Sequence, residues 1–341
     1  MRNKHTISVF VVLALLISMI SGSFAIDASS MDGDNYFITT PYEYPITPAD
    51  DQWKELVSHI DMIDACQIPE NILNHMSTEA LVETVLNYPL LSDMLAWSDK
   101  TAGFKSVASN FNGLTELLSR VDAPDILGSS QIMLMQQKDI NDDENYLERN
   151  KARCATLILN NINKDLMTAY TLPEPQTGAI MTPSGSYVLY YKELTFVDLA
   201  NLFDNVPFTE TDFSDLELHY EKTYPLAEKI GPISPSYNCH SYAWYSTSTN
   251  NKYWLLDINP YIYDPFYVAV RLSDAKKGDK VVYIDNSDYP PNFVHSAIVY
   301  SVPTNSDFLD RIATSKWDFM GVYKHPIGHC PYAGRYYNVY R

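Results

Sequence analysis

Hydrophobic residues recur at helical spacing in the first half of the chain. Within residues 49–167, apolar side chains return every three or four positions, which is the spacing of one helix face. The clearest segments are residues 77–88, 114–123 and 147–166. Ser77 provides a capping side chain for the first of them, and Pro89 follows its end. Residues 49–171 are therefore predicted to form a helical module.

The second half has the pattern of an antiparallel sheet. Proline and glycine are frequent in residues 171–185, which indicates a linker, and the domain boundary is placed near Leu172. A short helix is predicted over 195–203, and the acidic stretch 204–225 is interpreted as irregular. Short apolar or alternating segments then predict strands over 280–284, 294–302, 311–316, 319–324 and 336–340. With one helix expected near Cys239, residues 172–341 are predicted to form an α+β domain.

The N-terminus has the pattern of an export signal. Arg2 and Lys4 precede an apolar run over residues 7–20, and small residues lead to a cleavage point near Ala25. Residues 1–25 are therefore interpreted as a signal peptide, and 26–48 as an extended lead. The mature protein is expected to be secreted and not to associate with the membrane.

The net charge of the chain limits the kinds of partner that it can bind. The formal net charge is −18, and a strongly acidic chain repels the phosphates of nucleic acid. Nucleic-acid binding is therefore not expected. The 26 tyrosines are more simply explained by half-buried strands than by a sugar-binding or peptide-binding surface.

The chain has four cysteines. Cys66 and Cys154 fall in helical patterns, and we expect them either to be free thiols in the core or to form one disulfide. A disulfide between Cys239 and Cys330 is the main competing explanation of Cys239, because it would remove the thiol from chemistry.

Two motifs carry the chemistry. Residues 238–244 read Asn-Cys-His-Ser-Tyr-Ala-Trp, which places Cys239 where a Pro-containing loop runs into a helix. The helix dipole at that point favours thiolate over thiol. Residues 294–299 read Val-His-Ser-Ala-Ile-Val, with His295 near the start of a strand. A histidine that removes the thiol proton completes the minimum equipment for nucleophilic acyl transfer, and the backbone N–H of Cys239 would serve an oxyanion.

Strand periodicity places His295, Ala297 and Val299 on one face of their strand. The small Ala297 is expected to leave room on that face for the approaching helix. Cys239 Sγ and His295 are therefore predicted to lie within hydrogen-bond reach of one another at a cleft, with Cys330 too distant for a disulfide.

These motifs, with a Gly-Asp turn and strand at residues 278–283 between them, resemble the NlpC-type and CHAP-type cell-wall cysteine hydrolases. The resemblance covers about 110 residues from Tyr237 onward. It implies a papain-like fold, hydrolysis of an amide in a peptide or peptidoglycan stem peptide, and no cofactor or metal. Asn238 stands where these enzymes often have Asp, and His240 where they have a small residue.

The resemblance also implies a polar group on the strand after His295 to orient the imidazole. Lys316 stands near that place and cannot accept the imidazole N–H while protonated. His325 is the favoured alternative, with Ser315 or a backbone carbonyl as the others. The catalytic set is thus Cys239, His295 and His325. The substrate-binding set is Asn238, His240 and Lys316, the last for a substrate carboxylate.

Two other readings stay open. The first is a zinc-binding module, because six Cys and His residues lie in this domain, and the spacing from His325 to Cys330 suits zinc. They are Cys239, His240, His295, His325, His329 and Cys330. The second is a papain-like secreted protein that has lost catalysis and binds a partner, which the departures at His240 and Lys316 favour.

Overall fold

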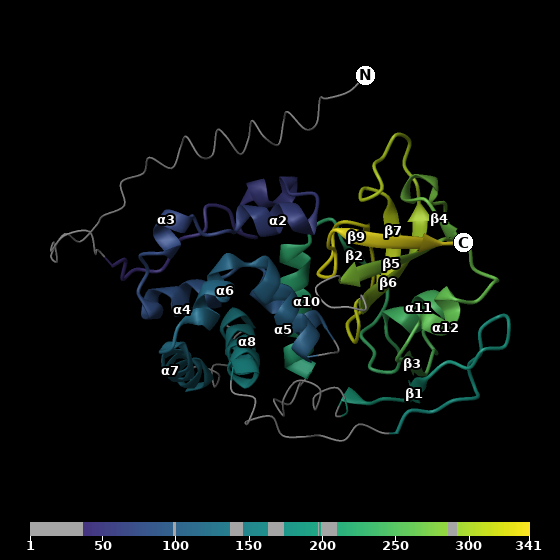
Figure 1. Cartoon of the computed structure of the whole chain (residues 1–341), viewed down its shortest axis with the longest axis horizontal. Coiled ribbons are helices and arrows are strands. Elements are labelled where there is room, and N and C mark those ends of the chain that lie inside the picture. Colours follow the sequence, from purple (N-terminus) through teal and green to yellow (C-terminus); the bar gives the residue numbers. More distant parts are fainter. Residues whose placement is uncertain are drawn as a thin grey trace.

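The computed structural model describes residues 37–97, 100–136, 146–162, 174–196, 198, 210–285 and 292–341. The signal peptide, residues 26–36 of the lead and most of the predicted helix over 195–203 lie outside these residues. We call residues 37–162 the helical half and residues 174–341 the C-terminal half. Helices gather on one side of Figure 1 and a sheet on the other, so the protein is of the α+β class.

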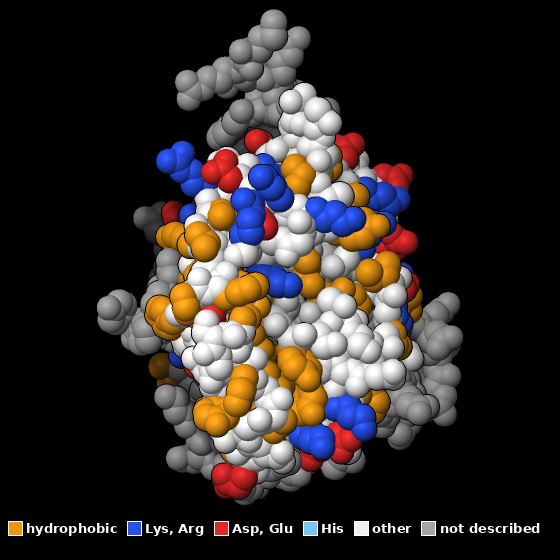
Figure 2. Space-filling view, turned by 90° about the vertical axis from the view of Figure 1, so that its right-hand side faces the viewer, with side chains coloured by type: hydrophobic (Ala, Val, Ile, Leu, Met, Phe, Trp, Pro, Cys, Tyr) orange, Lys and Arg blue, Asp and Glu red, His pale blue; other side chains and the backbone are white. Residues whose placement is uncertain are grey.

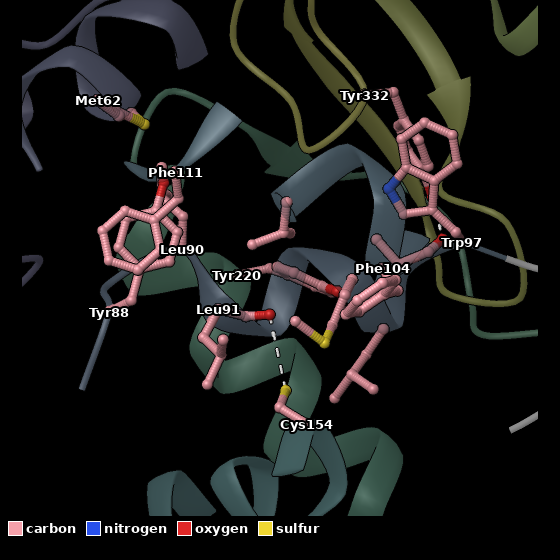
Figure 3. Packing of buried hydrophobic residues seen from close by; sticks show 14 of the residues in the cluster. Met62, Tyr88, Leu90, Leu91, Trp97, Phe104, Phe111, Cys154, Tyr220 and Tyr332 are labelled. Carbon is pink, nitrogen blue, oxygen red and sulfur yellow. Dashed lines mark hydrogen bonds between the residues drawn. The ribbon is translucent and has the colours of Figure 1, made fainter. Parts of the chain in front are cut away.

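The helical half consists of short helices. Its elements are η1 (Asp51–Glu55), α2 (His59–Ala65), α3 (Glu70–Leu73), α4 (Thr78–Leu86), η2 (Leu91–Ala96), α5 (Lys100–Asn110), α6 (Asn112–Ser119), α7 (Ala123–Gln136) and α8 (Tyr146–Ile162). The predicted cap is confirmed, because the Ser77 side chain accepts a hydrogen bond from the Ala80 N–H. Cys154 lies in the core, where its thiol donates to the Leu91 carbonyl at 3.6 Å (Figure 3). All four cysteines are free, so neither proposed disulfide is present.

The C-terminal half is built on an antiparallel sheet in the order β2-β8-β7-β6-β5-β9-β4. Its strands are β2 (Glu228–Lys229), β4 (Ala269–Val270), β5 (Lys280–Asp285), β6 (Asn292–Ser301), β7 (Ile312–Lys316), β8 (Val322–Pro326) and β9 (Tyr336–Tyr340). A separate pair joins β1 (Tyr190–Lys192) to β3 (Tyr253–Leu255). The other elements are α10 (Glu210–Thr223), α11 (Cys239–Trp244), α12 (Asn259–Ile262) and η6 (Leu272–Asp274). The late strands agree with the predictions, except that β8 begins three residues after the predicted start.

The stretch 204–225 contains a correction, because its described part forms the 14-residue helix α10 instead of irregular chain. The helix packs on α8, and two buried ion pairs join them: Arg149 with Asp215 at 2.6 Å, and Arg153 with Asp212. These partners lie outside the sequence neighbourhood of α10, so its own residues carry little sign of the contact. In Figure 1, α10 lies between the other helices and the sheet.

The two faces of the sheet have different neighbours. The inner face carries Val281, Tyr283 and Ala297, and its core continues without a break into the helical half. The opposite face, which we call the α11 face, carries Val282 and Ile298 and packs against α11 and α12. A side chain's position in the two-residue strand alternation therefore decides which half of the molecule it meets.

Polar contacts hold the helical half to the C-terminal half. The Trp53 indole N–H donates to the Thr223 carbonyl at 2.8 Å. The two ring nitrogens of His59 lie 2.8 Å from the Ala333 carbonyl and 2.9 Å from the Asp93 carboxylate. Because buried polar groups need partners, the contacts of Trp53 with Thr223 and of His59 with Ala333 help to set the relative position of the two halves.

Candidate active site

Cys239 is the first residue of α11, as predicted. Asn238 caps the helix, with its side-chain oxygen accepting from the Ser241 N–H at 3.0 Å. Its amide nitrogen donates to the Leu255 carbonyl at 2.8 Å. Asn238 is buried and its side chain is occupied by these bonds, so its role in the described structure is capping and not contact with substrate.

The Cys239 thiol is almost fully buried, with 5% of the residue exposed. Burial raises its pKa, and the negative charge of Asp318 acts in the same direction. Backbone hydrogen bonds from Ser296 and His240, together with the positive charge of Lys316, lower that pKa. Burial is the largest of these effects, so the resting form is the thiol.

His295 does not meet Cys239 in a hydrogen bond. Its side chain is fully buried, and neither ring nitrogen has a hydrogen-bond partner among the described residues. The ring stacks on Tyr332 with centroids 4.0 Å apart and lies 5.0 Å from the ring of Tyr283. Burial lowers the pKa of His295 well below its ordinary value, so the imidazole is neutral. The predicted contact at a cleft is therefore wrong for this conformation.

The reason is strand alternation. His295 pairs with Tyr283 and lies on the inner face, as do Ala297 and Val299. The expected grouping on one face is confirmed, but α11 packs on the other face. Ser296, the next residue, meets the helix: its hydroxyl is 2.9 Å from His240 Nδ1 and accepts from the Trp244 indole N–H at 3.0 Å.

His325 does not orient His295. Its Nε2 lies 2.7 Å from the Ser315 hydroxyl and its Nδ1 lies 2.8 Å from the Pro326 carbonyl. Burial lowers the pKa of His325 to about 4. Both nitrogens are thus occupied, and the predicted third catalytic role is wrong in this arrangement. Ser315, the other candidate, is bonded to His325 and leaves the His295 nitrogens unpaired.

His240 and Lys316 are also engaged internally. Burial lowers the pKa of His240 to about 4, and its Nδ1 faces Ser296. The Lys316 ammonium donates to the carbonyls of Ser234, Asp318 and Met320, and the side chain is fully buried. An ammonium enclosed in this way cannot reach a substrate carboxylate, so the substrate-binding assignment of Lys316 is wrong for the described structure.

The Cys and His residues do not form a metal centre. Among the described residues, no group of three or more His, Cys, Asp or Glu side chains is placed to hold a metal ion. His329 has its own partners, with Nδ1 3.1 Å from the Val57 carbonyl and Nε2 accepting from the Leu226 N–H at 3.3 Å. Burial raises the pKa of Cys330 to about 12. The six candidate ligands do not converge, and the structure therefore gives no support to the zinc reading.

Two residues of the site were missed. Tyr332 covers His295, and its hydroxyl donates to the Ala96 carbonyl of the helical half at 2.6 Å, beside Trp97 (Figure 3). No local pattern around Tyr332 indicates this contact, which joins residues 236 positions apart. Alternation in the sequence places Ser296 opposite His295 on its strand, but only the tertiary structure shows that α11 covers the Ser296 face.

Comparison with protein-family models, with curated proteins and with solved structures finds no match to this chain. The resemblance to NlpC-type and CHAP-type hydrolases accordingly remains a prediction from the motifs. In the described residues, no helix is long and apolar enough to cross a membrane.

Proposed function

We propose that this protein is a secreted, papain-like cysteine hydrolase that cleaves an amide bond in an extracellular peptide, with peptidoglycan stem peptides as the first substrate class to test. The observation that carries the proposal is the setting of Cys239. It begins a helix packed on an antiparallel sheet, with backbone donors and a buried lysine acting on its thiol.

The reaction would follow the usual course for a thiol nucleophile. Cys239 loses its proton, the thiolate attacks the carbonyl carbon, and the amine leaves after receiving a proton. Water then hydrolyses the thioester and restores the thiol. For His295 to exchange these protons it must leave the Tyr332 ring and turn toward the α11 side, so the described arrangement corresponds to a closed form.

The free-energy cost of the unpaired His295 nitrogens is consistent with such a rearrangement. Each buried polar group left without a hydrogen bond costs about 1–3 kcal/mol, and His295 has two such nitrogens in the closed form. A form in which either nitrogen gains a partner recovers part of that free energy. The stacking on Tyr332 and the surrounding packing oppose it.

A second candidate is a non-catalytic secreted binding protein. It is favoured by the buried thiol and by exposed aromatic side chains between α12 and β4, where Tyr263 is 79% and Phe266 is 66% exposed. Figure 2 shows that side of the molecule, on which hydrophobic side chains form several patches among Lys and Arg. Exposed aromatic residues of this kind often contact partners.

The test combines labelling and turnover. Iodoacetamide is applied at neutral pH and the labelled cysteine is located by mass spectrometry. Purified muropeptides are then incubated with the wild type, with Cys239→Ala and with Cys330→Ala. Cys330 is the matched control, because it is a buried free thiol in the same half. Hydrolysis lost only in Cys239→Ala supports the hydrolase, whereas binding without turnover in all three proteins supports the second candidate.

A further inference from the structure

Lys316 is a lysine in an unusual place. It ends β7, and its side chain is fully buried. Three main-chain carbonyls accept the hydrogens of its ammonium. A buried charge is costly to keep, so such a lysine needs either strong compensation or a function.

The carbonyl partners connect Lys316 to the segment that leads into the nucleophile. Ser234 accepts from Lys316 Nζ at 2.9 Å, and the Tyr237 ring lies 5.0 Å from the same atom. Both residues come within five positions before Cys239. The other two acceptors, Asp318 and Met320, belong to the turn between β7 and β8. Lys316 therefore joins this turn to the approach of α11.

Lys316 also lies on the correct face of the sheet. It pairs with Val322, which packs against Tyr237 and Tyr242, and Tyr242 belongs to α11. Alternation places Lys316 with Thr314, whose partner across the strands is Ile298, on the α11 face. His295 is on the inner face. Of His295 and Lys316, only Lys316 lies on the face that α11 covers.

The charges around the thiol lead to the same assignment. Lys316 lowers the pKa of Cys239, while Asp318 raises it. His240 beside the thiol has a pKa lowered to about 4 by burial and is neutral at physiological pH. The nearby Tyr283 and Tyr332 are neutral as well, because burial raises the pKa of each phenol. The cation that acts on the thiol is therefore Lys316.

Resting on the hydrolase proposal, we infer that Lys316 is the positioning residue of the nucleophile: its ammonium holds the 234–238 segment in place and stabilises the Cys239 thiolate. In this role Lys316 takes up no proton from the thiol; in the proposed reaction that proton passes to His295. A Cys239 thiolate would in turn stabilise the charged form of Lys316. Burial lowers the pKa of Lys316 to about 7, and the charges of Asp318 and of a Cys239 thiolate oppose that change.

The experiment measures the rate of Cys239 alkylation by iodoacetamide from pH 6 to 10, using mass spectrometry of the Cys239 peptide. It compares the wild type with Lys316→Met, which keeps the aliphatic length, and with Lys316→Arg. Lys324→Met is the control. Lys324 is a lysine on the neighbouring strand whose ammonium binds Glu228 at 2.6 Å. Thermal unfolding is recorded for every variant.

Lys316→Met is expected to slow alkylation of Cys239 by about tenfold across this pH range, because a rise of one unit in the pKa of the thiol lowers the thiolate fraction about tenfold. Lys316→Arg is expected to restore the rate, and the control Lys324→Met to leave it unchanged. An unchanged rate in folded Lys316→Met, or an equal slowing in Lys324→Met, overturns the inference.

If Lys316→Met does not fold, the inference is tested in the wild type by comparing two cysteines. Cys239 must then alkylate faster than Cys330 in the same molecule, and an equal or slower rate overturns the inference. No substrate is used in these measurements, so their outcome is separate from that of the muropeptide assay. If alkylation of Cys239 depends on Lys316 but muropeptides are not hydrolysed, the result counts against the hydrolase proposal and leaves the role of Lys316 intact.

Discussion

Neighbouring polar residues of β6 have opposite surroundings on the two faces of the seven-stranded sheet. On the α11 face, Ser296 contacts two side chains of the helix, and Lys316 satisfies three carbonyls. On the inner face, His295 is equally buried but has no hydrogen bond to either ring nitrogen. The polar groups of Ser296 and Lys316 are therefore paired. The face with the unpaired histidine stores a cost of a few kcal/mol.

The difference shows why neighbouring residues in a motif need not act together. His295 and Ser296 are adjacent in sequence, yet the strand sends one toward the helical half and the other toward α11. What closes the inner face is contributed by distant parts of the chain: Tyr332 on the ring of His295, and Ala96 on the hydroxyl of Tyr332. The helical half is therefore part of the environment of His295.

Among the perturbations that test this comparison, we expect acid to have the largest effect on stability. Burial lowers the pKa of His325, His329 and His219 to about 4, and the pKa of His295 falls well below its ordinary value. The unfolded chain takes up these protons near pH 6.5, whereas the folded protein does not until about pH 4. The unfolded state therefore binds more protons in this window, and stability falls as the pH decreases through it.

Each such histidine contributes up to about 1.4 kcal/mol for each pH unit between those values. We expect unfolding before pH 4, with stability fully retained above about pH 6.5. Hydrogen exchange should show β8 and the inner face opening before α11, because the α11 face carries only His240 of this group. A melting temperature that stays constant from pH 7 to 4 would contradict the expectation. In His329→Gln, the slope with pH should be smaller.

The contact between the halves gives the next largest effect. His59→Ala removes the partner of the Ala333 carbonyl and one of the two partners of the Asp93 carboxylate, the other being the Tyr224 hydroxyl at 2.6 Å. Leaving such buried groups unpaired is expected to cost about 2–4 kcal/mol in the free energy of unfolding, measured by urea denaturation. His75→Ala, a histidine in the same half with contacts to its own helix, is the control and should stay within about 0.5 kcal/mol.

Tyr332→Phe gives the smallest effect and sharpens the comparison most directly. The ring still covers His295, but the hydrogen bond to the Ala96 carbonyl is lost, at a cost of about 1 kcal/mol. Modification of His295 by diethylpyrocarbonate, measured by mass spectrometry, should become faster because the cover is held less firmly. Equal rates in the variant and the wild type would show that Ala96 does not hold the inner face closed.

The local elements were largely predictable. The helix after Ser77 and the strand over 336–340 are found as expected, because capping residues and two-residue alternation act within a few positions. The helix α10 was missed, since buried ion pairs with α8 support it and those partners lie more than 50 residues away. A local pattern carries no record of such partners.

The candidate site likewise has some features that the sequence predicts and others that it does not. Cys239 at the start of a helix, and His295 on the same face as Ala297, follow from the sequence alone. Which face α11 covers does not, because either face of β6 offers apolar residues for packing. That choice was decided by Ser296, Val322 and the helical half on the inner side.

The sequence by itself therefore determined the class of fold, the positions of the late strands along the chain and the helix that presents the thiol, since these depend on short-range periodicity and capping. Only the tertiary structure decided which cation acts on Cys239, what covers His295, and that His325 bonds to Ser315. These relations join residues that are distant in sequence or on opposite faces of one strand. They arise from packing the whole chain around a shared core, where each buried polar group takes the partner that geometry leaves within reach.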